Sequence, residues 1–236
     1  MQFSVPGLAE QVAPSARLRQ ALVRRAALAF AVLLLASTGF AQRPLPLSGV
    51  IVNPTGAEGT ISAWGGYLDA GAQSTVALGT VAPDGAFTLE LPGTIAPTAL
   101  GEVDITGLCV GGGGDMTVTP ARFGHMVVNF LLAFETSEPV GAMMASSDET
   151  LKRLSGEDRA PQEGDYVVYF LYVAETVRVE GACVGPNQEP VRYDLRAGPG
   201  WNTLLLTYEV VDGGVRAVLS SVDRVPEGAA WRSLVD

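Results

Sequence analysis

Cysteine, histidine and lysine are scarce in this 236-residue sequence, which holds two cysteines, Cys109 and Cys183, one histidine, His125, and one lysine, Lys152. Zinc and copper sites usually gather several histidine or cysteine ligands, and this chain does not supply them. A D-x-D-x-D-G calcium loop and a G-x-S-x-G nucleophile motif are also absent. We therefore interpret His125 as structural, and the sequence predicts no metal ligand, no cofactor-binding residue and no catalytic residue.

The first 41 residues differ in composition from the rest. An uninterrupted apolar run at 26–36 follows four arginines, and Gly39 and Ala41 supply small residues before Gln42. This pattern is typical of a secretory signal peptide. The apolar run is too short to span a bilayer, which argues against a transmembrane helix. An uncleaved anchor is the alternative. We expect export to the periplasm, cell envelope or exterior and a mature chain of residues 42–236; the long basic part leaves open whether Met1 is the true start.

Positive charge is scarce in the expected mature chain. The leader holds four of the 15 basic residues and one of the 25 acidic residues, which leaves 11 and 24 and a net charge of −13. Such a surface repels phosphate backbones and anionic lipids, so nucleic-acid binding is disfavoured. The acidic residues are scattered singly, which is typical of a solvated, soluble surface.

Apolar residues after residue 42 lie in short runs or alternate with polar ones, and glycine or proline separates these segments. The pattern predicts an all-β fold of antiparallel β-sandwich modules. Pro83-Asp84-Gly85 is the strongest hairpin signal. The apolar run at 166–173 predicts a central strand covered on both faces. Expected strands are 47–52, 60–64, 74–81, 86–91, 103–110, 116–123, 126–135, 166–174, 176–184, 191–196, 201–211 and 215–222.

One polar stretch breaks the strand pattern. The sequence SSDE at 146–149 fits a capping box, and Gly156 suits the end of a helix. We predict a short helix at about 147–155 in a linker of residues 137–163. The linker separates an N-terminal module, 42–136, from a C-terminal module, 164–236. Neither module alone buries a generous core, so we expect the two packed modules to share one core.

An internal repeat explains a run of four glycines at 111–114. Residues 107–135 align without a gap with 181–209, and nine of the 29 positions are identical. Three of the glycines align with Pro-Asn-Gln, so we interpret the run as a turn and not as a phosphate-binding loop. The repeat places Cys109 and Cys183 at equivalent positions, which makes a disulfide plausible; two buried thiols are the alternative. Arg122 and Glu135 recur as Arg196 and Glu209, which we interpret as an ion pair within each unit.

Aromatic residues are the remaining candidates for binding. Trp64, Trp201 and Tyr193 could stack on sugar rings, although core packing explains such residues equally well. The leading hypothesis is a non-catalytic envelope or surface protein that contacts an envelope protein or a polysaccharide. A carbohydrate-binding module is the first alternative. A hydrolase using two carboxylates is the second, and it requires them to lie roughly 5–10 Å apart.

A family resemblance covers residues 47–92. The segments LSGV at 47–50, GTV at 79–81 and DGAFTLELP at 84–92 resemble the carboxypeptidase-regulatory or transthyretin-like β-sandwich of bacterial envelope proteins. The resemblance implies a structural or interaction module and carries no catalytic residue. It does not extend beyond residue 93.

Overall fold

The computed structural model of this protein describes most of the chain after residue 41. The described residues are 42–66, 74–110, 115–135, 138–147, 149–150, 153, 161–185, 188–212 and 214–233. The predicted signal peptide and the glycine run at 111–114 lie outside them. Residues 42–236 form one compact unit.

The described residues form fourteen strands that pair into one sheet, so the all-β prediction is confirmed. Pairing is antiparallel throughout except between β11 and β13. A sandwich arrangement of modules stays a prediction. The strands are β1 (Leu45–Val50), β2 (Gly59–Gly66), β3 (Ser74–Val81), β4 (Ala86–Leu91), β5 (Gly101–Asp104), β6 (Thr117–Thr119), β7 (Arg122–Glu135), β8 (Glu138–Ser146), β9 (Tyr166–Val173), β10 (Val177–Val184), β11 (Pro190–Ala197), β12 (Gly200–Val211), β13 (Gly214–Val222) and β14 (Ala230–Ser233).

The β3–β4 hairpin shows how local sequence sets these strands. Phe87, Leu89 and Leu91 are buried on β4, whereas the residues between them are exposed. The turn that precedes β4 contains Gly85 at a φ of 83°, and the Gly85 N–H donates to the carbonyl of Ala82 (2.9 Å). Glycine adopts this positive φ without steric cost. The predicted hairpin is confirmed.

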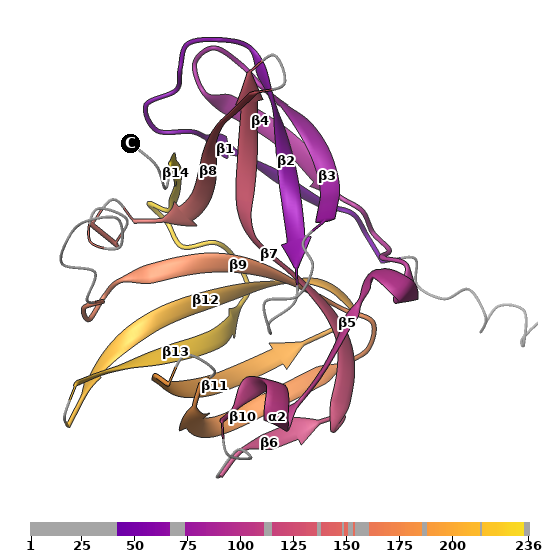
Figure 1. The fold of residues 1–236 in the computed structure, drawn as a ribbon, viewed down its shortest axis with the longest axis vertical. Helices are drawn as coiled ribbons and strands as arrows, with labels where there is room; N and C mark the ends of the chain where they lie inside the picture. Colours follow the sequence, from indigo (N-terminus) through magenta and orange to yellow (C-terminus); the bar gives the residue numbers. More distant parts are fainter. Residues whose placement is uncertain are drawn as a thin grey trace, which may run out of the picture. The chain divides into compact units, whose positions relative to one another are not determined.

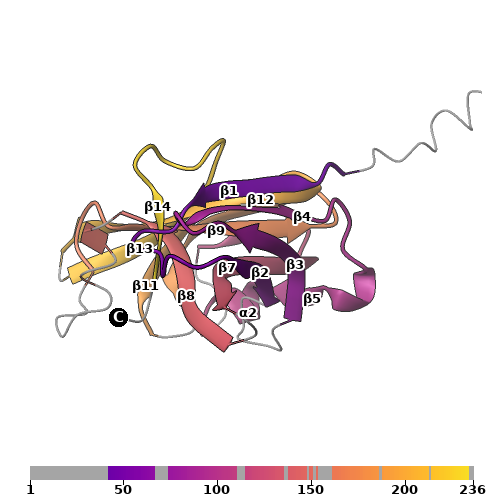
Figure 2. The same ribbon diagram turned by 90° about the horizontal axis from the view of Figure 1, so that it is seen from above.

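One half of the sheet closes on itself (Figures 1 and 2). Its strands run β14, β8, β7, β2, β3, β4 and β1 in hydrogen-bonded order. Ile51, directly after β1, then bridges Trp231 of β14, and the N–H of Val52 donates to the Trp231 carbonyl (2.9 Å). The closure therefore gives β1 and β14 a neighbour on their outer edges at this point.

This half encloses the first hydrophobic cluster, named here the Trp231 core. Trp231 contacts Phe87 edge-to-face, with ring centroids 5.5 Å apart, and stacks on Phe170 at 6.3 Å. Most of the other buried members come from β1, β2, β4 and β7 to β9; they include Leu47, Ile61, Leu89, Leu91, Leu131, Met143 and Val168.

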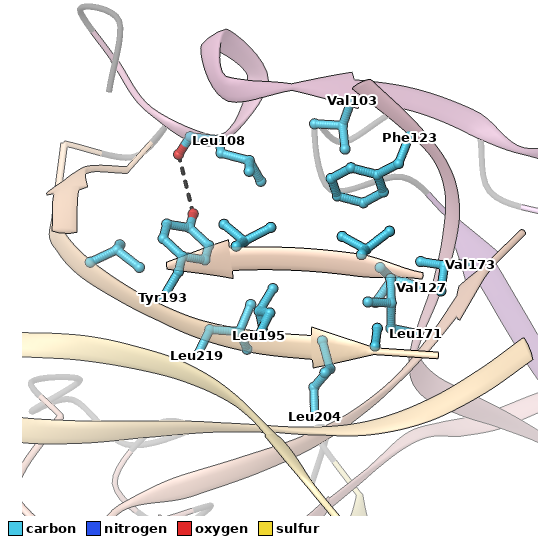
Figure 3. Close-up of a cluster of buried hydrophobic side chains, with 14 of the residues drawn as sticks. Val103, Leu108, Phe123, Val127, Leu171, Val173, Tyr193, Leu195, Leu204 and Leu219 are labelled. Atoms are coloured by element: carbon cyan, nitrogen blue, oxygen red, sulfur yellow. Dashed lines mark hydrogen bonds between the residues drawn. The ribbon is translucent and has the colours of Figure 1, made fainter. Parts of the chain in front are cut away.

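The other half of the sheet runs from β7 and β9 through β12, β13, β11 and β10 to β6, and it holds the second cluster, named here the Tyr193 core (Figures 1 and 3). Its buried members include Val103, Leu108, Phe123, Val127, Leu171, Val173, Tyr193, Leu195, Leu204 and Leu219. Each core contains residues from both predicted modules, 42–136 and 164–236. The two modules therefore do not have separate cores.

Strand β9 separates the two cores, as the sequence predicted for a central strand. Val168 and Phe170 belong to the Trp231 core, whereas Leu171 and Val173 belong to the Tyr193 core. Successive side chains of a strand point to opposite faces, so an apolar run without alternation serves two cores at once.

Two predicted strands are shorter in the structure. The run 103–110 was expected to be one strand, but β5 ends at Asp104 and a four-residue helix, α2 (Ile105–Leu108), follows. The Asp104 carboxylate accepts from the N–H groups of Thr106 (2.9 Å) and Gly107 (3.3 Å), which caps the helix. The expected strand 116–123 is interrupted at Pro120, which has no N–H to donate to a strand ladder.

The predicted linker, 137–163, contains a strand that the sequence analysis missed. β8 pairs with β7 on one side and with β14, also missed, on the other. Of the predicted helix, only Glu149, Thr150 and Arg153 are described as helical. Ser147 Oγ accepts from the Thr150 N–H (3.1 Å), as a helix cap does, and the rest of that helix lies outside the described residues.

Strands of the two aligned segments lie on either side of β9 and on either side of β10, two strands that do not pair with each other. β9 lies between β7 and β12, and β10 lies between β6 and β11. This placement suits a pseudo-twofold relation between 107–135 and 181–209. The repeat itself stays a prediction.

Candidate interaction surface

The disulfide predicted between Cys109 and Cys183 is present, with Cα atoms 5.8 Å apart. It joins Cys109, the residue directly after α2, to Cys183 near the end of β10. The pKa of Asp104 is lowered, first by the hydrogen bond from the Thr106 hydroxyl, so the capping carboxylate stays charged. Leu108, the last residue of α2, is buried in the Tyr193 core. The bridge and the cap thus fix α2 over this core.

The three candidate stacking residues do not come together. Tyr193 is 7% exposed, and its hydroxyl donates to the carbonyl of Leu108 (3.2 Å; Figure 3). Burial raises its pKa to about 12. Trp201 packs against the other core and donates its indole N–H to the Pro92 carbonyl (2.8 Å). Trp64 donates to the Ser62 hydroxyl (2.8 Å). Tyr193 therefore serves the core, and both tryptophan N–H groups are used within the protein.

A charged face covers the outer side of β10, β11 and β13 and the neighbouring end of β12. Along β10 and β11 the charged residues alternate with valine, tyrosine and leucine residues of the Tyr193 core, so the strand pleat places the charges outside. We name this surface the arginine face. It consists of Arg178, Glu180, Arg192, Asp194, Arg196, Glu209 and Arg216.

Each of two glutamates on this face holds two arginines. Glu180 accepts from Arg178 (2.7 Å) and from Arg196 (3.1 Å) through its two carboxylate oxygens. Glu209 accepts from Arg192 (3.2 Å) and is also paired with Arg216. The predicted pairing of Arg196 with Glu209 is therefore wrong: Glu180, on the adjacent strand β10, is the partner of Arg196.

The arginines set the protonation state of both glutamates. The Arg178 hydrogen bond, followed by that of Arg196, lowers the pKa of Glu180. The Arg216 hydrogen bond is the main cause of the lowered pKa of Glu209. A general acid requires a raised pKa, so neither glutamate suits that role. They instead hold guanidinium groups in place.

The arginine face is cationic within an acidic chain. Four arginines and three carboxylates give it a charge of +1, whereas the other seven basic and 21 acidic residues after residue 41 give −14. The side chains of Arg178 and Arg196 are 55% and 69% exposed. Because charges are screened over about 8 Å at physiological salt, a partner close to this face interacts mainly with the local positive charge and not with the net negative charge of the chain.

A second polar cluster lies where β9 begins. Asp165, 2% exposed, accepts from Arg153 Nε (2.8 Å), from the Gln162 N–H (2.8 Å) and from the Thr150 hydroxyl (3.3 Å). Burial acts to raise the pKa of Asp165, but these hydrogen bonds and the Arg153 charge together lower it. The cluster holds the helical segment against β9 and is structural.

His125 is fully buried on β7, with its ring 5.8 Å from that of Phe123. Arg122 pairs with Glu102 (3.4 Å) and Asp104 (3.5 Å) at the surface. Within the described ranges, no three histidine, cysteine, aspartate or glutamate side chains are grouped to hold a metal ion. No helix in the same ranges has the length and apolar character of a membrane span.

No family model, curated protein or solved structure matches this chain. The resemblance of residues 47–92 to transthyretin-like domains stays a prediction. No sequence motif marks Arg178, Glu180, Arg192, Asp194 or Arg216. The available signal was a charged residue at every second position of two adjacent strands.

Proposed function

We propose that this chain is an exported, non-catalytic protein of the cell envelope or surface that acts by binding another protein. The leader sequence supports export, and the Cys109–Cys183 disulfide suits an oxidising compartment. The arginine face is the proposed contact, and its partner is an envelope protein with an acidic surface.

The paired arginines carry this proposal. Each glutamate neutralises the charge of one of its two arginines and orients both guanidinium groups. One net positive charge remains in each group of one glutamate and two arginines. A guanidinium has five N–H donors, so donors that do not bind the glutamate remain for carboxylates of a partner. Holding these side chains in place before binding lowers the entropy lost on association.

The test is crosslinking capture from the native envelope. The double variant Arg178→Gln/Arg196→Gln should bind the partner captured by the natural chain about tenfold more weakly at low salt, because two exposed charge contacts are lost. Arg224→Gln removes an exposed arginine elsewhere and is the matched control. Equal capture by the double variant and the control would show that the arginine face is not the contact.

A carbohydrate-binding module is the second candidate. It is supported by Trp64 and Trp201, whose side chains are only half-buried. It predicts that the mature protein sediments with purified cell wall or polysaccharide and that Trp201→Ala abolishes sedimentation. Absence of sedimentation removes this candidate.

A further inference from the structure

Gln42, the residue that follows the predicted cleavage site, lies in a slot formed by three distant segments. Oriented so that both ends of its amide are satisfied, its nitrogen donates to the Gly93 carbonyl (3.2 Å) and to the Tyr172 hydroxyl. Its oxygen accepts from the Gly200 N–H (3.3 Å). Tyr172 is 3% exposed, so its hydroxyl has few other partners.

Two glycines shape the slot. A Cβ atom at Gly93 would collide with the Gln42 carbonyl oxygen. Gly200 has a φ of 101°, which side-chain-bearing residues rarely adopt, and a Cβ there would touch the Gln42 side chain at 3.6 Å. Asn202 fixes the turn before β12, because its amide accepts from the Gly198 N–H (2.9 Å) and donates to the Gly200 carbonyl (2.9 Å). The two glycines thus leave room for the close approach of Gln42.

An N-terminal glutamine has a characteristic reaction. Its α-amino nitrogen attacks the side-chain Cδ, a new N–Cδ bond closes a five-membered lactam, and the Cδ–Nε2 bond breaks. The amide nitrogen leaves as ammonia and takes a proton from the attacking amine. No oxidant or reductant is involved.

We propose that the slot holds Gln42 as the N-terminal residue of the mature chain and prevents this cyclisation while the domain is folded. The inference rests on the export step of the proposed function, because Gln42 has a free α-amino group only after cleavage behind residue 41. The lactam lacks the NH2 group that donates to Gly93 and Tyr172. Folding therefore stabilises the open form over the cyclised form.

The first experiment follows ammonia loss by mass spectrometry in a chain that begins at Gln42, released from a fusion by a protease. A peptide of residues 42–52 is the unfolded reference. Cyclisation should be at least about tenfold slower in the folded chain, since the three hydrogen bonds of the Gln42 amide must be broken. Equal rates in the chain and the peptide would overturn the inference.

Tyr172→Phe removes one of the two acceptors and should accelerate cyclisation about fivefold in the folded chain. Tyr169→Phe is the matched control, because Tyr169 lies on the same strand but packs against the Tyr193 core. A change of equal size in both variants would also contradict the role of the slot.

A second experiment separates this inference from export. The chain is recovered from the natural envelope, and the mass of its N-terminal peptide is measured. An open glutamine at position 42 is expected. A start at another residue overturns the inference but leaves export intact, whereas a retained leader contradicts the proposed export itself.

Discussion

Removing the disulfide should cost this protein a large part of its stability. The double variant Cys109→Ala/Cys183→Ala opens a covalent loop that spans 74 positions of the chain. The entropy of closing such a loop in the unfolded state corresponds to about 4.5 kcal/mol. Cys109 is also 2% exposed, and the void left by its sulfur adds roughly 1 kcal/mol.

The assay is urea unfolding of the oxidised chain and of the double variant, both starting at residue 42. In a thermal scan of the same two proteins, the 4.5 kcal/mol from loop closure alone should lower the melting temperature by roughly 9–18 °C for a chain of this size. The slope of the unfolding free energy against urea should rise, because an unbridged denatured chain exposes more surface. The reduced natural chain is the control and should behave like the variant. A loss below about 1 kcal/mol with an unchanged slope would refute the loop-closure argument.

Three further predictions concern buried contacts. Asp165→Ala should destabilise the domain by about 3 kcal/mol in chemical unfolding, because it leaves the Arg153 guanidinium unpaired, whereas Asp223→Ala at the exposed surface should change little. Folding lowers the pKa of Asp165, so the stability that its carboxylate contributes is complete above about pH 5. This contribution is lost as the pH falls through the folded-state pKa. The difference in unfolding free energy between the natural chain and Asp165→Ala should therefore shrink below about pH 4. Trp231→Ala should cost about 3–5 kcal/mol, because Trp231 packs between Phe87 and Phe170 where the sheet closes, and Trp64→Ala should cost less; equal losses would contradict the importance of the closure.

Most strands were predictable because their signals are local. The turn at Gly85 and the alternation on β4 depend only on backbone geometry and on which face is buried. The unbroken apolar run of β9 likewise indicated cover on both faces. β14 was missed because its partner, β8, lies far away in the chain. β8 pairs with the preceding strand β7 and was missed because the sequence predicts a linker at residues 137–163.

Helix α2 shows where a local signal was overlooked. The run 103–110 is apolar enough for a strand, yet Asp104 is followed by Thr106 and Gly107, whose N–H groups it caps. The cap ends β5 and turns Leu108 toward the Tyr193 core. Tyr193 is a different case, because the sequence cannot say whether a tyrosine faces the core or a ligand, and the structure buries it in the core.

Sequence alone determined the all-β class and the alternation that separates buried from charged positions, and it offered Cys109 and Cys183 as the one pair of cysteines for a disulfide, since these follow from residue chemistry and spacing. Only the tertiary structure decided that Glu180 is the partner of Arg196, that Trp231 meets Ile51, and that Gln42 enters a slot between Gly93 and Gly200. Each of these contacts joins segments that are far apart in the chain. The sequence of one segment does not show which other segment lies beside it, because strand order depends on the packing of the whole chain.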